Sequence, residues 1–176
     1  MSPSRSPSPL VAILLGSDSD LPKLLGCLET LDRLGVPHEV RILSAHRTPA
    51  ELVEFVAQAP GRGVRLFVCA AGGAAHLAGA VAARTDLPVI GIPIDSSPLG
   101  GLDALLSTAQ MPGGVPVATV GVGSGGPKNA GVLAARILAL GDPALGERLA
   151  AERAAMQRAT LEKDRAVRER RKGTER

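Results

Sequence analysis

The sequence predicts an α/β fold with a parallel sheet, because five short apolar runs alternate with stretches of helical periodicity. Each run has the length and continuous apolar character of a strand that is buried on both faces. Strands and helices that alternate in this way form a parallel sheet with helices on both sides. The length of 176 residues, with 45% hydrophobic and 21% charged residues, indicates one soluble domain.

The first two strand-helix units have well-marked boundaries. Residues 10–15 predict a strand, and leucines at helical spacing follow it up to Gly35, a typical helix stop. Residues 38–43 predict the second strand. Thr48 and Pro49 then begin a helix, as its N-cap and its first residue.

Three further strand-helix units complete the prediction. We expect strands at 64–69, 88–92 and 115–120, and helices at 74–84, 102–110 and 128–140. This order predicts a three-layer α/β/α sandwich with a parallel, doubly wound sheet, either flavodoxin-like or Rossmann-like. Residues 130–140 are apolar nearly all round, interrupted only by Arg136, so we expect another subunit to cover part of that helix.

The two ends of the chain differ from its middle. We expect a disordered tail over 1–9, a single domain over 10–164 that includes a C-terminal extension helix, and a frayed basic tail over 165–176. The net charge of +3 arises in the C-terminal segment, because residues 1–141 carry ten basic and ten acidic residues and 142–176 carry ten and seven. With no Trp, no Tyr and two Phe, the chain has no aromatic platform for bases, and we expect no nucleic-acid partner.

Cysteine usage and apolar run lengths bear on the compartment. Cys27 and Cys69 lack CxxC spacing, which favours buried thiols in a reducing environment. No stretch has the length of a signal-peptide core or of a membrane span. We therefore expect a cytoplasmic protein that has no membrane association.

Three polar, glycine-containing stretches predict one functional site. They are GSDSD (16–20), SAHRTP (44–49) and AAGGAAH (70–76), and each directly follows a predicted strand. Loops at the carboxyl ends of neighbouring parallel strands converge in space. The stretches contain His46 and His76, which can exchange protons near neutral pH. With their hydroxyls, carboxylates and Arg47, they indicate an enzyme that acts on a small phosphorylated molecule.

The first loop has a functional and a structural interpretation. Ser17 and Ser19 can bind phosphate oxygens or ring substituents, whereas Asp18 and Asp20 suit sugar hydroxyls or an amino group. The structural alternative is that Asp20 caps the following helix. The loop matches neither a dinucleotide nor a triphosphate fingerprint.

The other two loops supply a cation, two imidazoles and flexible backbone. Arg47 suits a phosphate, and His46 can act as acid and base. Gly72 and Gly73 permit either a close backbone approach to a ligand or a tight turn, and His76 faces a ligand or a neighbouring loop. A zinc site made of both histidines and an Asp is an alternative, although the usual ligand spacing is missing.

Seven ordered motifs are similar to one family, the N5-carboxyaminoimidazole ribonucleotide mutases (PurE) of bacterial-type purine biosynthesis. The motifs are GSDSD, SAHRTP, AGGAAHLAG, PVIGIP, GLDALLS, QMPGGVPVAT and NAGVLAARIL, within residues 11–140. The resemblance implies a three-layer sandwich and a homo-octamer whose active sites are shared between subunits. It also implies carboxylate transfer from N5 of the substrate to C4 of its imidazole, with no metal, nucleotide or organic cofactor.

The resemblance implies roles for individual residues. His46 would carry the proton, Ser19 and Arg47 would hold the ribose phosphate, and Asp20 the ribose hydroxyls. The aminoimidazole and carboxylate would contact Ser17, Ser44, Ala71 and Gly72. The chain departs from the family pattern at Ala78, where Pro is common, and at Gly125-Gly126-Pro127, and both departures bear on loop rigidity.

Two other functions remain open at this point. The animal-type relative, a carboxylase that fixes free carbon dioxide on aminoimidazole ribonucleotide, has Lys in place of Arg47, so the SAHR loop favours the mutase. The other alternative is a flavin-binding or nucleotide-binding module without catalysis. Flavin would need aromatic neighbours, which this chain almost lacks.

Overall fold

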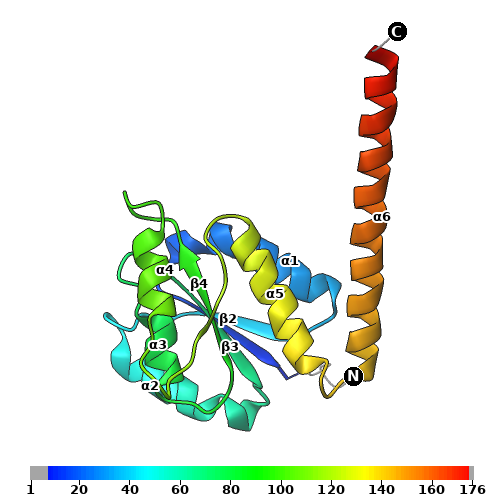
Figure 1. Ribbon diagram of the computed structural model, residues 1–176. Coiled ribbons are helices and arrows are strands. Elements are labelled where there is room, and N and C mark those ends of the chain that lie inside the picture. The colour runs from blue at the N-terminus through cyan, green and yellow to red at the C-terminus, as the bar shows by residue number, and fades with distance from the viewer. Residues whose placement is uncertain (1–7, 175–176) are drawn as a thin grey trace.

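A computed structural model of the chain describes residues 8–174, which form a five-stranded parallel sheet between two layers of helices (Figure 1). The sheet order is β2-β1-β3-β4-β5, with every neighbouring pair parallel, as in flavodoxin-like folds. The predicted three-layer α/β/α sandwich is confirmed. The strands are β1 (Val11–Leu15), β2 (His38–Ile42), β3 (Leu66–Gly72), β4 (Val89–Ile94) and β5 (Ala118–Thr119).

Helices cover both faces of the sheet and bury two separate clusters of apolar side chains. Ile13 and Ile92 point toward one layer, and Leu14 and Phe67 point toward the other, because successive strand residues alternate between faces. The first layer contains α1 (Leu25–Arg33) and α5 (Gly125–Leu138). The second contains α2 (Pro49–Gln58), α3 (Leu77–Ala82) and α4 (Leu102–Ala109), with a short 3-10 turn, η2 (Pro60–Arg62), after α2.

Several boundaries differ from the prediction. The fifth strand has two residues and not six, because Pro116 has no N–H to donate to a ladder. The first helix begins as a 3-10 segment, η1 (Asp18–Leu24), before α1, and α3 is shorter than the predicted 74–84. Strand β3 extends to Gly72, which places two predicted site residues at its carboxyl end.

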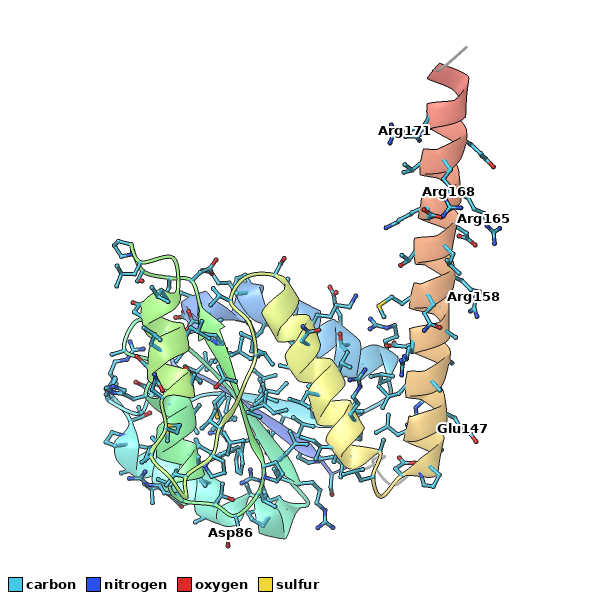
Figure 2. The ribbon with its side chains drawn as sticks, in the orientation of Figure 1. Asp86, Glu147, Arg158, Arg165, Arg168 and Arg171 are labelled. Atoms are coloured by element: carbon cyan, nitrogen blue, oxygen red, sulfur yellow. The ribbon has the colours of Figure 1, made fainter. Side chains whose placement is uncertain are left out.

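The last helix, α6 (Pro143–Thr174), starts in the core and then leaves the domain. Leu145 is 2% exposed and packs with the core on the α1 and α5 side, and Arg148 Nε donates to the Leu34 carbonyl oxygen at 2.9 Å. Described side chains from 155 to 171 are all exposed, and Figure 2 shows Arg158, Arg165 and Arg168 on the projecting part. The helix therefore continues through the segment that was expected to fray after 165.

Three further expectations concern the N-terminal tail, the two cysteines and membrane-spanning helices. Residues 1–7 of the expected N-terminal tail lie outside the described residues. Cys27 and Cys69 are free and buried, as predicted, and burial raises the pKa of the Cys27 thiol to about 12. Within residues 8–174, no helix combines the length and apolar composition that crossing a membrane requires.

Candidate active site

One cavity of about 410 Å³ lies where the first four strands end, and the three predicted loops meet there. Strands β1, β2 and β3 are neighbours in a parallel sheet, so the segments that follow them share one edge. Nine of the ten predicted site residues line this cavity; Gly73 does not. The nine are Ser17, Ser19, Asp20, Ser44, His46, Arg47, Ala71, Gly72 and His76.

The first loop presents hydroxyls to the cavity and buries one carboxylate. Ser17 occupies the N-cap position of η1, where its Oγ accepts from the Ser19 backbone N–H and from the Ser19 hydroxyl, the latter at 2.9 Å. Asp20 is therefore not the cap of this helix. Its side chain lies in the cavity wall and the residue is only 6% exposed. The N-cap position expected as the structural alternative for Asp20 belongs to Ser17, and the Asp20 carboxylate lines the cavity while it also bonds to the backbone of Ser17.

The second loop is a compact turn that orients His46 and Arg47. The Ser44 hydroxyl accepts from the backbone N–H of His46 at 3.3 Å and of Arg47 at 3.2 Å. Thr48 occupies the predicted N-cap position of α2, but its hydroxyl bonds back to Ser44, accepting from the Ser44 N–H at 2.9 Å. These local bonds hold the loop without using either functional side chain.

Arg47 is held across the cavity mouth by the first loop. One of its terminal nitrogens donates to the Gly16 carbonyl oxygen, and its Nε lies 3.5 Å from the Ser44 hydroxyl. Of the described residues lining the cavity, Arg47 alone carries a Lys or Arg charge, and Asp20 alone carries a carboxylate. An anionic group of a ligand would therefore lie beside Arg47.

The third loop requires glycine at one position and involves a residue that sequence reasoning missed. A Cβ at residue 72 would lie 1.8 Å from Ser96 Oγ, so only glycine leaves the Ser96 hydroxyl in place. Ser96 lies in the loop after β4 and lines the cavity. The sequence analysis did not single out Ser96. Ser96 comes shortly after β4, which neighbours β3 in the sheet, and this position could have indicated that it lies at the site.

The two histidines of the site contact each other directly. Nε2 of His46 lies 2.7 Å from Nδ1 of His76, and the rings meet edge to face with centroids 4.9 Å apart. His76 occupies the N-cap position directly before α3, whereas the predicted helix over 74–84 included it in the first turn. Both side chains are exposed to the cavity and to solvent.

The pKa values of two carboxyl groups near the cavity are shifted in opposite directions, one by burial and the other by a cation. Burial raises the pKa of Asp20 above its ordinary value, and this effect exceeds the lowering by Lys23 and Arg47. Asp95 forms an ion pair with Lys23 at 2.6 Å, and the lysine's hydrogen bond and charge lower the pKa of Asp95. The ion pair joins the η1 segment to the loop that carries Ser96.

A metal site is the alternative use of the two histidines. Among the described residues, no three His, Cys, Asp or Glu side chains are grouped closely enough to hold a metal ion. The polar groups in the cavity are hydroxyls, backbone groups, one guanidinium, the Asp20 carboxylate and the histidine pair. This set suits a polar organic phosphate better than a zinc ion.

Comparison with known proteins identifies the family. Residues 10–159 match the AIR carboxylase family. The chain belongs to this family. The resemblance that the seven motifs indicated is thereby confirmed at the level of the family.

Individual AIR carboxylase relatives cover most of the chain. The N5-carboxyaminoimidazole ribonucleotide mutase of Synechocystis is 55% identical over 129 residues, which are 73% of this chain and 72% of that protein. The enzyme of the same name from Bacillus subtilis is 52% identical over 126 residues, 72% of this chain and 78% of that protein. The crystal structure of Treponema denticola PurE matches with a TM-score of 0.81 at 30% identity, covering 89% of this chain and 96% of that one.

Proposed function

We propose that this protein interconverts N5-carboxyaminoimidazole ribonucleotide and 4-carboxyaminoimidazole ribonucleotide in purine biosynthesis. The observation that carries the proposal is the position of His46 beside Arg47 in a cavity whose other polar groups are hydroxyls, backbone, the buried Asp20 carboxylate and His76. A proton carrier and a phosphate-binding cation lie on one short loop, held by Ser44. Relatives that are 50–55% identical and carry the mutase name support the same reaction.

Each cavity residue has a role that its chemistry allows. Arg47 and Ser19 would bind the ribose phosphate, and Asp20 would accept hydrogen bonds from the ribose hydroxyls. The imidazole and the transferred carboxylate would lie against Ala71, Gly72 and the hydroxyls of Ser17 and Ser44, with Gly73 and His76 bordering the same region. Gly72 allows this approach because its Cα carries no side chain.

The reaction needs one group that both gives and takes a proton. The carbamate C–N bond breaks, carbon dioxide is released inside the pocket, and His46 donates a proton to the nitrogen that is left. C4 of the imidazole then attacks the carbon dioxide, and His46 removes the proton from C4. Protons balance over the cycle, so one imidazole serves both steps and is regenerated.

Direct carboxylation with free carbon dioxide is the second candidate reaction. It is favoured by a relative named phosphoribosylaminoimidazole carboxylase in Schizosaccharomyces pombe, which is 53% identical over 127 residues, although these are only 23% of that longer protein. Arg47 supports the mutase, because the resemblance implies Lys at that position in the animal-type carboxylase. The two reactions differ in their substrate and in their need for free carbon dioxide.

A carboxyl-transfer assay with both substrates distinguishes these reactions. We expect turnover of N5-carboxyaminoimidazole ribonucleotide that does not depend on added bicarbonate, and little turnover of aminoimidazole ribonucleotide at any bicarbonate concentration. Bicarbonate-dependent turnover of the second substrate would assign direct carboxylation. Yellow colour in the purified protein, with no turnover of either substrate, would support a flavin-binding module.

We also propose a cytoplasmic homo-octamer in which neighbouring subunits complete each site. His46, Arg47 and His76 are exposed in the single chain, so an adjoining subunit would be needed to exclude water from the reaction. Val40 and Ile42 on the edge strand β2 are 36% and 53% exposed, and the described side chains of α6 from 155 to 171 are all exposed. Closed symmetry among identical chains would cover these surfaces.

A further inference from the structure

The His76 imidazole has no structural function in its own helix. His76 occupies the N-cap position of α3, but its side chain makes no capping hydrogen bond. The helix has six residues, Leu77–Ala82, and it packs through Leu77, Ala78 and Val81. Among the described residues, the one hydrogen-bond partner of the exposed His76 ring is Nε2 of His46.

We propose that His76 is a positioning residue that orients the His46 imidazole and couples the tautomer of His46 to its own. The inference rests on the proposed function only where it concerns turnover; the pairing itself is a property of the free protein. His76 is assigned here a role in holding the proton carrier, in addition to any contact that it makes with a ligand.

Counting protons shows why the contact restricts both rings. Two imidazole nitrogens at 2.7 Å attract each other only when one of them carries hydrogen and the other offers a lone pair. A neutral imidazole carries one ring proton, so the state of His46 Nε2 fixes whether His46 Nδ1 is protonated, and the same holds for His76. The pair therefore admits two matched tautomer combinations, whereas unpaired rings admit four.

The same count explains how the pair behaves when it takes up a proton. A third proton leaves one lone pair between the rings, so the hydrogen bond persists and the added charge can remain on His46. A fourth proton gives both facing nitrogens a hydrogen, which breaks the contact and places two positive charges side by side. His76 thus supports His46 as a carrier of one proton at a time, as the proposed reaction requires.

No carboxylate orients His46 in place of His76. Neither His46 Nδ1 nor His76 Nε2 has a hydrogen-bond partner among the described residues. Among the described residues that line the cavity, the one carboxylate, Asp20, has no hydrogen bond to either ring and bonds instead to the backbone of Ser17 in the first loop. In many histidine-dependent enzymes a carboxylate holds the catalytic imidazole in its orientation. Here the His76 imidazole has that function for His46.

Two substitutions of His76 separate positioning from folding. His76→Leu removes the partner, whereas His76→Asn supplies an amide that can donate or accept near the position of Nδ1. Asn is also favoured at N-caps, so α3 should be at least as stable in His76→Asn as in the wild type. We expect His76→Leu to lower kcat on the order of 10-fold to 100-fold with KM changed less than about 3-fold, and His76→Asn to recover most of the loss.

Nuclear magnetic resonance of the ring nitrogens tests the pairing without any substrate. The chain has three histidines, and His38→Gln identifies the signals of the third, which bonds to the Val36 carbonyl oxygen away from the cavity. In 15N-histidine-labelled protein near neutral pH, we expect matched tautomers, so that the fraction of His46 protonated on Nε2 equals the fraction of His76 protonated on Nε2. In His76→Leu we expect the His46 tautomer fractions to change, with no change at His38.

The outcomes distinguish this inference from the proposed function. An unchanged His46 tautomer in His76→Leu, or equal turnover in the wild type and His76→Leu, would overturn the role of His76 even if the mutase reaction is correct. A wild-type protein that does not turn over either ribonucleotide would refute the proposed function, and the nitrogen signals would still decide whether the two rings are paired.

Discussion

The Ser96 hydroxyl lies against the Cα of Gly72, where the carboxyl ends of β3 and β4 meet. A Cβ at position 72 would approach Ser96 Oγ to 1.8 Å, Ser96 Cβ to 3.1 Å and the Ile94 carbonyl oxygen to 3.2 Å. The most severe contact is with the end of a small side chain that can rotate, and the other two require small shifts. Substitution at Gly72 should therefore disturb the cavity more than the stability of the fold.

Gly72→Ala should lower kcat/KM on the order of 10-fold or more while lowering the free energy of unfolding by about 1 to 2 kcal/mol. Denaturant unfolding and the carboxyl-transfer assay measure the two effects. The matched control is the double variant Gly72→Ala with Ser96→Ala, which removes the hydroxyl that the methyl group would meet. If the double variant is no more active than Gly72→Ala, and Ser96→Ala alone is active, steric conflict with Ser96 is not the cause.

Removing the proton carrier should abolish chemistry and spare binding. His46→Asn keeps a polar side chain of similar shape, but an amide cannot exchange a proton near neutral pH. We expect kcat to fall on the order of 100-fold or more, with substrate affinity within about 3-fold of the wild type. Calorimetric titration with substrate and the turnover assay check this pair of values. Turnover within a few-fold of the wild type would exclude His46 as the acid and base.

The guanidinium of Arg47 should contribute to affinity through the substrate's phosphate. Arg47→Lys keeps the charge but loses the planar fork, and we expect binding to weaken by about 1 to 3 kcal/mol. Because Arg47 also donates to the Gly16 carbonyl oxygen, thermal unfolding of the variant should be measured alongside. A dephosphorylated substrate analogue provides the control. If the analogue loses as much affinity as the substrate, Arg47 does not bind the phosphate.

Asp20 should reduce stability at neutral pH, because its burial disfavours the ionised carboxylate. Its pKa is raised above the ordinary value of 3.8, so the ionised form at neutral pH is less favourable in the folded than in the unfolded chain. At a pH below 3.8 the Asp20 carboxyl is protonated in both states, and the folded chain has its full stability. As the pH rises through the raised pKa, the folded chain must ionise a buried carboxyl, and its free energy of unfolding falls. Asn at position 20 cannot ionise, so Asp20→Asn should be more stable than the wild type at pH 7 and similar to it in acid.

Thermal unfolding of the wild type and of Asp20→Asn, from acid to pH 7, measures how the ionisation of Asp20 changes stability. Asp18→Asn is the matched control, because Asp18 lies two residues away in the same loop but is exposed, and it should show no such gain. Asp20→Asn should also weaken substrate binding if the carboxylate accepts from ribose hydroxyls. An Asp20→Asn variant that is less stable than the wild type at pH 7 would show that Lys23 and Arg47 outweigh the burial of the carboxylate.

The site could be predicted from the sequence to the extent that the parallel sheet determines it. Once strands were expected before residues 16, 44 and 70, sheet geometry brought the three loops together, and nine predicted residues line one cavity. Ser96 could not be selected, because its position depends on where β4 ends relative to Gly72. The pairing of His46 with His76 was likewise not predictable, since it depends on the two ring orientations and not on chain direction.

The predicted bounds of the fifth strand and of the C-terminal helix differ from the structure for physical reasons that can be named. The sequence of the fifth strand is apolar and β-branched, but Pro116 interrupts the ladder there. The C-terminal extension helix has few apolar residues, yet Leu145 near its start is buried beside α5 and Leu149 packs against the same cluster. These two residues reach the core because α6 follows α5 after a short turn.

Removal of the outer part of α6 should reduce the size of the assembly. We expect the full chain to be a homo-octamer in light scattering, and a chain that ends at Gly141 to be smaller and less active. That truncation also deletes the buried Leu145, the Arg148 bond to Leu34 and the Glu152 partner of Arg33. Its effect therefore combines loss of assembly with loss of subunit stability.

A chain that ends at residue 154 separates these two causes. It keeps Leu145, Arg148 and Glu152 in place and removes the segment whose described side chains are all exposed. If that segment packs on another subunit, the shorter chain should unfold at nearly the same denaturant concentration as the full chain but form smaller particles. Its activity should fall in parallel, because the exposed His46, Arg47 and His76 would lose the neighbouring subunit that excludes water. A fully active monomer after this truncation would refute both the assembly and the shared site, since a site complete within one chain needs no partner to function.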